Sequence, residues 1–429
     1  MKNHFRRVVT FFLLFFSVIL IEVVSGQVLP DDNLIYKPNI KTVLLFKEGF
    51  EMSAPIMRLR SGESLRLSFD DLDGDMKHYQ YTIIHCEADW TTSADLRVTD
   101  YLDGYNEDRI DDFEYSFNTT VHYTHYSLSF PSRDLRPKIS GNYIMLVFLD
   151  DPSNVVFTRR FMITEATPLE ITGNVHQASA IPNRYTHQEV DFTLKMNGMQ
   201  INDPSREIKV VLMQDGRWDN AITSLKPRFY RSESLDYDYD NENEFPGGNE
   251  FRSFDIKSLM YQTERIKKIT FDSGGNEVYL LDDQRRTFKN YVTDKEINGR
   301  KLIKNEDHVQ NSDIQADYAW VHFSLPVDAI LANGQLYLLG ALTDWQLNDE
   351  SKMIYDPDGK RYTKTLFLKQ GYYNYLYVFR DNKTKRSDLS LIEGNHWETE
   401  NEYTILVYYH ENGGQYDRLI AVQDLNSIH

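Results

Sequence analysis

The sequence contains a single cysteine, Cys86, among 429 residues. One cysteine cannot form an intramolecular disulfide, so the fold must depend on ordinary apolar cores. At the usual size of about 100–200 residues per domain, the chain is long enough for about two to four cores. Cys86 also lies far from the N-terminal region, which excludes a lipid-anchored N-terminal cysteine.

Long apolar runs are scarce, and after the N-terminal region none approaches the roughly 20 residues of a membrane-spanning helix. Within the N-terminal region, an apolar run over residues 8–21 follows the basic residues Lys2, Arg6 and Arg7, and its roughly 14 residues are too few to span a bilayer comfortably. Small residues at 24–26 then suit cleavage before Gln27. This pattern predicts a signal peptide over residues 1–26 and an exported mature chain.

Basic residues are fewer than acidic residues. The chain has 47 Lys and Arg against 65 Asp and Glu, a formal net charge of −18. Affinity for nucleic acid depends on clustered basic side chains, and so does docking on anionic lipid. We therefore expect no nucleic-acid partner and no direct membrane insertion.

Aromatic residues are abundant, with 28 Tyr and 24 Phe. They recur in short alternating runs such as 64–69 and 126–130, which are typical of half-buried strands. The continuous apolar run over 143–149 predicts a strand buried on both faces, and 150–154 has the composition of a hairpin turn before 155–164. Helical periodicity is hard to find. The predicted fold class is all-β, with tandem immunoglobulin-like or early-set β-sandwich domains.

We divide the mature chain into segments 27–167, 168–325 and 326–429. The second contains a polar stretch over 236–248 that we expect to form a long, solvated hairpin or loop. The third combines a strand over 334–340, a turn bearing Trp345 and an aromatic strand over 371–379. Its rhythm resembles immunoglobulin-like early-set domains, which include glycogen-binding modules.

Few residues are grouped in a way that suggests chemistry. His85 and Cys86 are adjacent, and on a strand they point to opposite faces, so we interpret Cys86 as a buried core thiol. The histidines at 85, 122 and 125 do not have the spacing of a metal site. The sequence shows neither a Ser-His-Asp order nor a phosphate loop. We expect no catalytic residue, no cofactor and no metal, and therefore no enzyme.

Strings along nearly the whole mature chain resemble one family, the plug proteins of type IX secretion in the Bacteroidetes. They include His85-Cys86 with Ala88-Asp89-Trp90, Phe245 to Arg252, and Tyr416 to Ile420. The motif positions that we single out, without a role, are His85, Cys86, Asp89, Trp90, Tyr101, Gly104, Asn118, Thr119, His125, Tyr126, Gly141, Asn142, Asn249, Glu250, Phe251, Arg252, Tyr408, Tyr409, Asp417 and Arg418.

The resemblance implies a periplasmic protein that associates with the outer membrane through the type IX translocon. Its partners would be the translocon barrel protein and its associated subunits, and its task would be to close the periplasmic opening. The alternative function is a carbohydrate-binding envelope protein that uses Trp345 and Trp397 of the third segment. A secreted cargo is disfavoured, because the last residues do not resemble a sorting domain.

Overall fold

The computed structural model describes residues 32–272, 274–308 and 311–427. Strands make up 46% of the chain and helices 4%, which confirms the predicted all-β class. The helices are single turns: α1 (Val98–Tyr101), α2 (Pro204–Glu207), α3 (Ser312–Gln315) and the 3-10 turn η1 (Ala341–Thr343). No described helix is long and apolar enough to cross a membrane. The predicted signal peptide lies outside the described residues.

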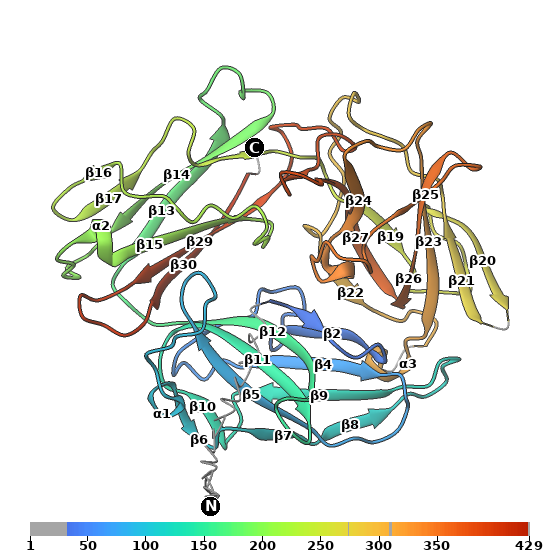
Figure 1. Ribbon diagram of the computed structural model, residues 1–429, viewed down its shortest axis with the longest axis horizontal. Coiled ribbons are helices and arrows are strands. Elements are labelled where there is room, and N and C mark those ends of the chain that lie inside the picture. Colours follow the sequence, from blue (N-terminus) through green and yellow to red (C-terminus); the bar gives the residue numbers. More distant parts are fainter. Residues whose placement is uncertain (1–31, 273, 309–310, 428–429) are drawn as a thin grey trace, which may run out of the picture. The chain divides into compact units, whose positions relative to one another are not determined.

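The N-terminal sandwich occupies the first predicted segment (Figure 1). One sheet has the order β1-β12-β11-β5-β7, with β3 on β12; the other has the order β2-β4-β9-β8, and β10 pairs with β6. The strands are β1 (Leu34–Ile35), β2 (Ile40–Lys47), β3 (Ile56–Arg58), β4 (Leu65–Asp71), β5 (Tyr79–Cys86), β6 (Leu102–Gly104), β7 (Asp108–Ile110), β8 (Asp112–Tyr115), β9 (Thr124–Phe130), β10 (Leu135–Pro137), β11 (Gly141–Leu149) and β12 (Val155–Thr164).

Strand β11 is buried on both faces, as its continuous apolar run predicts. On one face Tyr143, Met145 and Val147 join the core of the N-terminal sandwich. On the other face Ile144 packs in a second apolar cluster that includes residues of the middle sandwich. A hairpin joins β11 to β12, and the Leu149 N–H donates to the Asn154 carbonyl across it at 3.2 Å.

The middle sandwich draws its strands from two distant parts of the chain. One sheet has the order β13-β14-β17-β16, with β18 on β14, and the other has the order β15-β29-β30. The strands are β13 (Glu170–Gln177), β14 (His187–Lys195), β15 (Ile208–Gln214), β16 (Phe229–Tyr230), β17 (Ser234–Tyr237), β18 (Glu244–Pro246), β29 (Glu402–Tyr409) and β30 (Arg418–Asn426).

The third sandwich lies between β18 and β29 in the sequence. Its sheets have the orders β19-β27-β22, with β24 and β28 on β27, and β20-β21-β23-β26-β25. The strands are β19 (Arg252–Asp255), β20 (Ile266–Asp272), β21 (Gly275–Leu280), β22 (Lys301–Ile303), β23 (Tyr318–Pro326), β24 (Gly334–Leu339), β25 (Ile354–Asp356), β26 (Arg361–Lys369), β27 (Gly371–Asp381) and β28 (Ser387–Asp388).

This strand pairing differs from the predicted division into 168–325 and 326–429. The boundary at 325 and 326 falls inside β23, and β29 pairs with β15, so the C-terminal strands complete the middle sandwich. Figure 1 shows the red β29 and β30 beside the green β15. The third sandwich is thus an insertion within the middle sandwich. A division of the chain into three consecutive segments cannot represent such an insertion.

The polar stretch over 236–248 is a loop between two short strands and does not fold back as a hairpin. Both β17 and β18 pair antiparallel with β14, so they run in the same direction along it. Asn243 in the intervening loop is fully buried and donates to the Val190 carbonyl at 2.8 Å. The polar composition therefore reflects an interrupted strand, because such side chains satisfy backbone groups at the break.

Candidate functional site

An apolar joint connects the N-terminal and middle sandwiches. Cys86 and Trp90 belong to it, and Cys86 is fully buried. The other buried members are Ala88, Ile144, Met162, Val211, Met213, Leu406, Tyr408 and Leu419. Cys86 is therefore a small packing residue in this cluster, as the sequence interpretation held.

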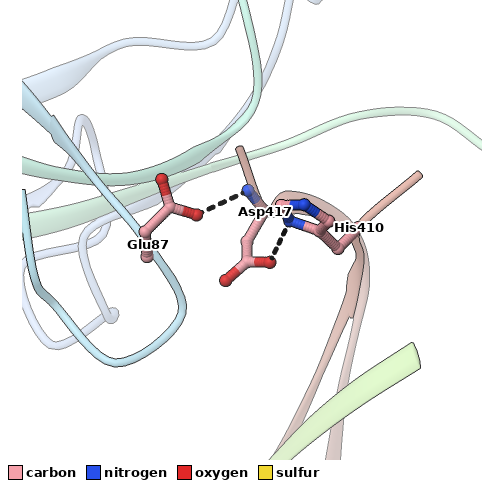
Figure 2. A group of neighbouring side chains, drawn as sticks. All are labelled: Glu87, His410 and Asp417. Carbon is pink, nitrogen blue, oxygen red and sulfur yellow. Dashed lines mark hydrogen bonds and ion pairs between the residues drawn. The ribbon is translucent and has the colours of Figure 1, made fainter. Parts of the chain in front are cut away.

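A polar network lies beside this joint, around Asp417 (Figure 2). Asp417 Oδ2 accepts from the Ala88 N–H at 3.0 Å and from Lys209 Nζ at 2.8 Å. Asp417 Oδ1 is 2.9 Å from His410 Nδ1. The Asp417 N–H donates to Glu87 Oε2 at 2.8 Å. One residue of β30's leading turn thus binds groups from both sandwiches.

The electrostatics of this network favour a charged Asp417. Burial raises the pKa of its carboxyl, but the bonds from Lys209 and the Ala88 N–H outweigh burial and lower the pKa below its usual value. Burial raises the pKa of Glu87. Glu87, His410 and Asp417 offer ligand atoms within 4.8 Å of one another, as a metal site would. The Lys209 ammonium already neutralises Asp417, so we interpret the group as a salt-bridged joint.

Two further motif residues, Tyr408 and Arg418, fasten the same joint. The Tyr408 hydroxyl, fully buried, donates to Asn142 Oδ1 at 2.7 Å. Arg418 donates from Nε to Glu165 Oε1 at 2.9 Å and from Nη2 to Glu165 Oε2 at 2.8 Å. A bidentate arginine–carboxylate pair fixes orientation as well as distance. These motif positions therefore hold two sandwiches together.

His85 and Cys86 do not form a catalytic pair. The two residues are neighbours on β5, and their side chains leave it on opposite faces. His85 is hydrogen-bonded to Ser93 Oγ at 2.8 Å and to the Ser140 carbonyl at 3.1 Å. Burial lowers the pKa of His85 to about 4, so its ring is neutral at neutral pH. Gly141 is required beside it, since a Cβ there would lie 2.5 Å from His85 Nε2.

A loop containing Asn118 and Thr119 joins the N-terminal sandwich to the third. Asn118 adopts a left-handed conformation with φ of 58°. The following N–H groups of Thr120 and Val121 donate to the two oxygens of Asp317, at 2.8 and 3.0 Å. The Tyr123 hydroxyl donates to the Ala316 carbonyl at 2.8 Å.

A buried ion pair lies at the same joint. Lys369 Nζ donates to Asp70 Oδ2 at 2.6 Å, and both side chains are at most 1% exposed. His125 Nδ1 lies 2.7 Å from Asp70 Oδ1, and the Tyr318 hydroxyl donates to Oδ2 at 2.6 Å. Burial raises the pKa of Asp70, but Lys369 and His125 outweigh it, so the carboxyl stays charged. His125 is therefore part of an ion-pair joint.

The motif over 249–252 anchors the chain segment that leads from the third sandwich to β29. Arg252 binds Glu393 at 2.9 Å and Asp283 at 2.9 Å, and Glu393 is fully buried. Asn249 Nδ2 donates to the Glu393 carbonyl at 2.8 Å. Glu250 accepts from the Glu400 N–H at 3.1 Å. Phe251 packs edge-on against Trp345, with centroids 6.1 Å apart.

The remaining motif positions shape single sandwiches. Asp89 accepts from the Thr91 N–H at 3.0 Å within a turn. Tyr101 and Tyr126 lie in the N-terminal core, and Tyr409 in the middle one. Gly104 has a φ of 99°, and a Cβ there would lie 2.0 Å from the Asp134 carbonyl oxygen.

A cavity of about 710 Å³ has residues of all three sandwiches in its wall, including Trp90, Trp218 and Trp345. Two pairs of charges in the wall neutralise each other: Arg159 binds Asp344 at 2.8 Å, and Arg300 binds Glu402 at 2.9 Å. Trp345 lies in this wall, whereas Trp397 is held at the middle sandwich, where its carbonyl accepts from Gln188 at 2.6 Å. Carbohydrate binding by the two tryptophans stays a prediction.

Sequence reasoning missed the partners of the motif residues. They are Asp70, Glu87, Glu165, Asp317, Lys369 and Glu393. Asp70 follows the alternating run over 64–69, and Lys369 follows the run over 362–368. A charged residue that continues a buried strand is the signal that could have identified both, because a buried charge needs a partner.

Comparisons with known proteins agree with the resemblance. Residues 40–165 match the family described as "Type 9 secretion system plug protein 1st domain". The chain is 35% identical to a hypothetical protein from Parabacteroides merdae with a crystal structure at 2.30 Å resolution. That match covers 92% of this chain and 99% of the other, with a TM-score of 0.89. No protein of curated function matches.

Two other solved structures share little with this chain. The ectodomain of the teleost fish polymeric Ig receptor is 12% identical, with a TM-score of 0.14 over 44% of this chain and 77% of the other. The C-terminal domain of the Streptococcus agalactiae AgI/II polypeptide BspA is 8% identical, with a TM-score of 0.16 over 89% and 98%. The matched first domain and the strings that continue through all three sandwiches identify the chain as a member of the type IX secretion plug protein family.

Proposed function

We propose that this protein binds the periplasmic mouth of the type IX outer-membrane translocon and closes its pore between substrates. Membership of the family indicates a role in type IX secretion and association with the secretion machinery of the cell envelope. Closure of the translocon is the specific task that we assign to this chain. It requires a body that fills an opening, and it requires no chemistry.

The observation that carries the proposal is the fastening of three sandwiches into one compact unit, Asp31–His429. The Asp70–Lys369 and Arg418–Glu165 pairs each connect different sandwiches. Separation of the sandwiches would break these pairs and expose to water the apolar cluster that the N-terminal and middle sandwiches share, so separation is disfavoured. A body that resists deformation in this way can block a wide aqueous opening.

The motif residues support a role without catalysis. The polar motif residues described above form hydrogen bonds and ion pairs with other residues of the protein. Asp417, Arg418 and Arg252, for example, bind Lys209, Glu165 and Glu393. A catalytic group must instead present its reacting atom to a substrate. These contacts favour a structural role for the residues that the family resemblance singled out.

Co-purification tests the binding step. A tagged copy of the protein, produced in its own cells, is isolated from detergent-solubilised outer membranes, and its partners are identified by mass spectrometry. We expect the translocon barrel protein to be enriched at least about tenfold over the level recovered with an unrelated exported protein carrying the same tag, because a specific interface buries on the order of 1,000 Å². Equal recovery with the two tagged proteins would contradict the proposal.

A further inference from the structure

Strand β8, Asp112–Tyr115, lies at an open edge of the N-terminal sandwich. In the order β2-β4-β9-β8 it is the outermost strand and, among the described strands, pairs only with β9. All four residues are exposed. The side chains of Phe113 and Tyr115 are 38% and 55% exposed, and Phe117 just beyond is 59% exposed.

The backbone of this edge is directed outward at alternate residues. The Ser116 N–H donates to the Tyr123 carbonyl at 2.9 Å, so Ser116 faces β9. Because antiparallel pairing alternates along a strand, Phe113, Tyr115 and Phe117 direct their N–H and C=O groups away from β9. The Phe117 N–H confirms this, since it donates to the Ile314 carbonyl of α3 at 2.9 Å. Phe113 and Tyr115 offer the same groups beyond the end of that contact.

The edge has only part of the usual protection against pairing: β8 is four residues long and carries Asp112 and Glu114, but it has no lysine or proline. Exposed edge strands are commonly blocked by lysine or proline. Edge strand β20 of the third sandwich follows this rule with the exposed residues Lys267 and Lys268, and Pro357 directly follows edge strand β25. Residues 111–117 contain no Lys, Arg or Pro. Carboxylates repel an acidic strand but not a basic one, so this edge with its exposed aromatic side chains is suited to accept a strand of complementary charge.

The charges at the edge indicate what that strand carries. Asp111, Asp112 and Glu114 are exposed, and none forms an ion pair with another residue in the described part of the chain. Asp75 lies near, since its carbonyl accepts from Thr124, which pairs with Tyr115, but its carboxylate is 3.3 Å from Lys77 Nζ and is therefore not part of the unpaired set. Unpaired carboxylates alternate with Phe113 and Tyr115 along β8, so a complementary strand alternates Lys or Arg with apolar residues.

We propose that β8 is a docking edge that pairs with an extended, basic strand of the translocon. This inference rests on the proposed function, and it names the surface by which the plug is held. The added strand receives main-chain hydrogen bonds from Phe113 and Tyr115, apolar contact from their rings and attraction from Asp112 and Glu114.

The test is co-purification of the full-length protein with the translocon, as above, for two charge-matched double variants. D112K/E114K places lysines on the edge, and D349K/E350K makes the same change in charge on an exposed loop of the third sandwich. We expect the first to reduce recovery of the translocon at least about tenfold and the second to leave recovery near that of the unchanged protein. F113S/Y115S, which keeps the carboxylates, should also reduce it. Thermal unfolding of each purified variant checks that the fold is intact.

The outcomes separate this inference from the proposed function. Wild-type recovery with both D112K/E114K and F113S/Y115S would overturn the docking edge and leave closure of the pore in place. An equal loss with D349K/E350K would also overturn it, because net charge and not the edge would then govern binding. Loss of translocon recovery in the β8 variants alone would support the docking edge. If deletion of the gene nevertheless left the permeability of the outer membrane unchanged, the docking edge would stand and closure of the pore would be contradicted.

Discussion

Replacing Lys369 with methionine should lower the free energy of unfolding by about 3–5 kcal/mol. The ammonium of Lys369 is the main partner of Asp70, at 2.6 Å, in a site where both side chains are at most 1% exposed. Methionine leaves the Asp70 carboxylate buried without that charge. Urea denaturation followed by tryptophan fluorescence would measure the loss.

Two variants make this prediction specific. Lys267 is exposed on β20, and K267M should change the free energy of unfolding by less than about 0.5 kcal/mol. The double variant D70N/K369M removes both charges and keeps an acceptor for the Tyr318 hydroxyl, so it should recover most of the loss. If K369M were as mild as K267M, the buried pair would not fasten the N-terminal and third sandwiches as we infer.

Replacing Asp215 with asparagine should stabilise the protein at pH 8 and have little effect at pH 4. Burial raises the pKa of the Asp215 carboxyl from the ordinary 3.8 to about 7. Between these values the folded protein binds a proton that the unfolded chain does not, so stability falls as the pH rises from about 4 through 7. The difference between these two pKa values corresponds to a loss of about 4 kcal/mol in the free energy of unfolding at pH 8.

Asparagine removes this pH dependence and keeps an oxygen for the Glu402 N–H, which donates to Asp215 Oδ1 at 3.0 Å. Urea denaturation at pH 4, 6 and 8 would measure the effect, with the exposed Asp328→Asn as the control. A stabilisation that is the same at pH 4 and pH 8 would contradict the assignment of the titrating group. So would a variant that is less stable at pH 8 than the unchanged protein.

The strands of local hairpins could be predicted from the sequence. The run over 143–149, the turn over 150–154 and the run over 155–164 form β11, its hairpin turn and β12. The predicted strand over 334–340 likewise forms β24, and the aromatic strand over 371–379 lies within β27. In each case the alternation, turn composition and short separation that define the element lie within one stretch of chain.

The joints between sandwiches could not be predicted in this way. Asp70 and Lys369 are 299 residues apart, and Asn142 and Tyr408 are 266 residues apart. The pairing of β29 with β15, which makes the third sandwich an insertion, is also between distant residues. Strands of similar composition fit either sandwich, and only packing selects between them. The family resemblance pointed to many of the joint residues, although it gave them no role.

Closure of the translocon is tested most directly by the permeability of the outer membrane to a large hydrophilic antibiotic. The gene for this protein is deleted in cells that have the translocon and in cells that lack it. Susceptibility is then compared with that of the parent strains, and the deletion is complemented by the unchanged gene. We predict that the deletion increases susceptibility only in translocon-containing cells and that complementation reverses the increase. Unchanged susceptibility in translocon-containing cells would contradict the account, and so would an equal increase in cells without the translocon.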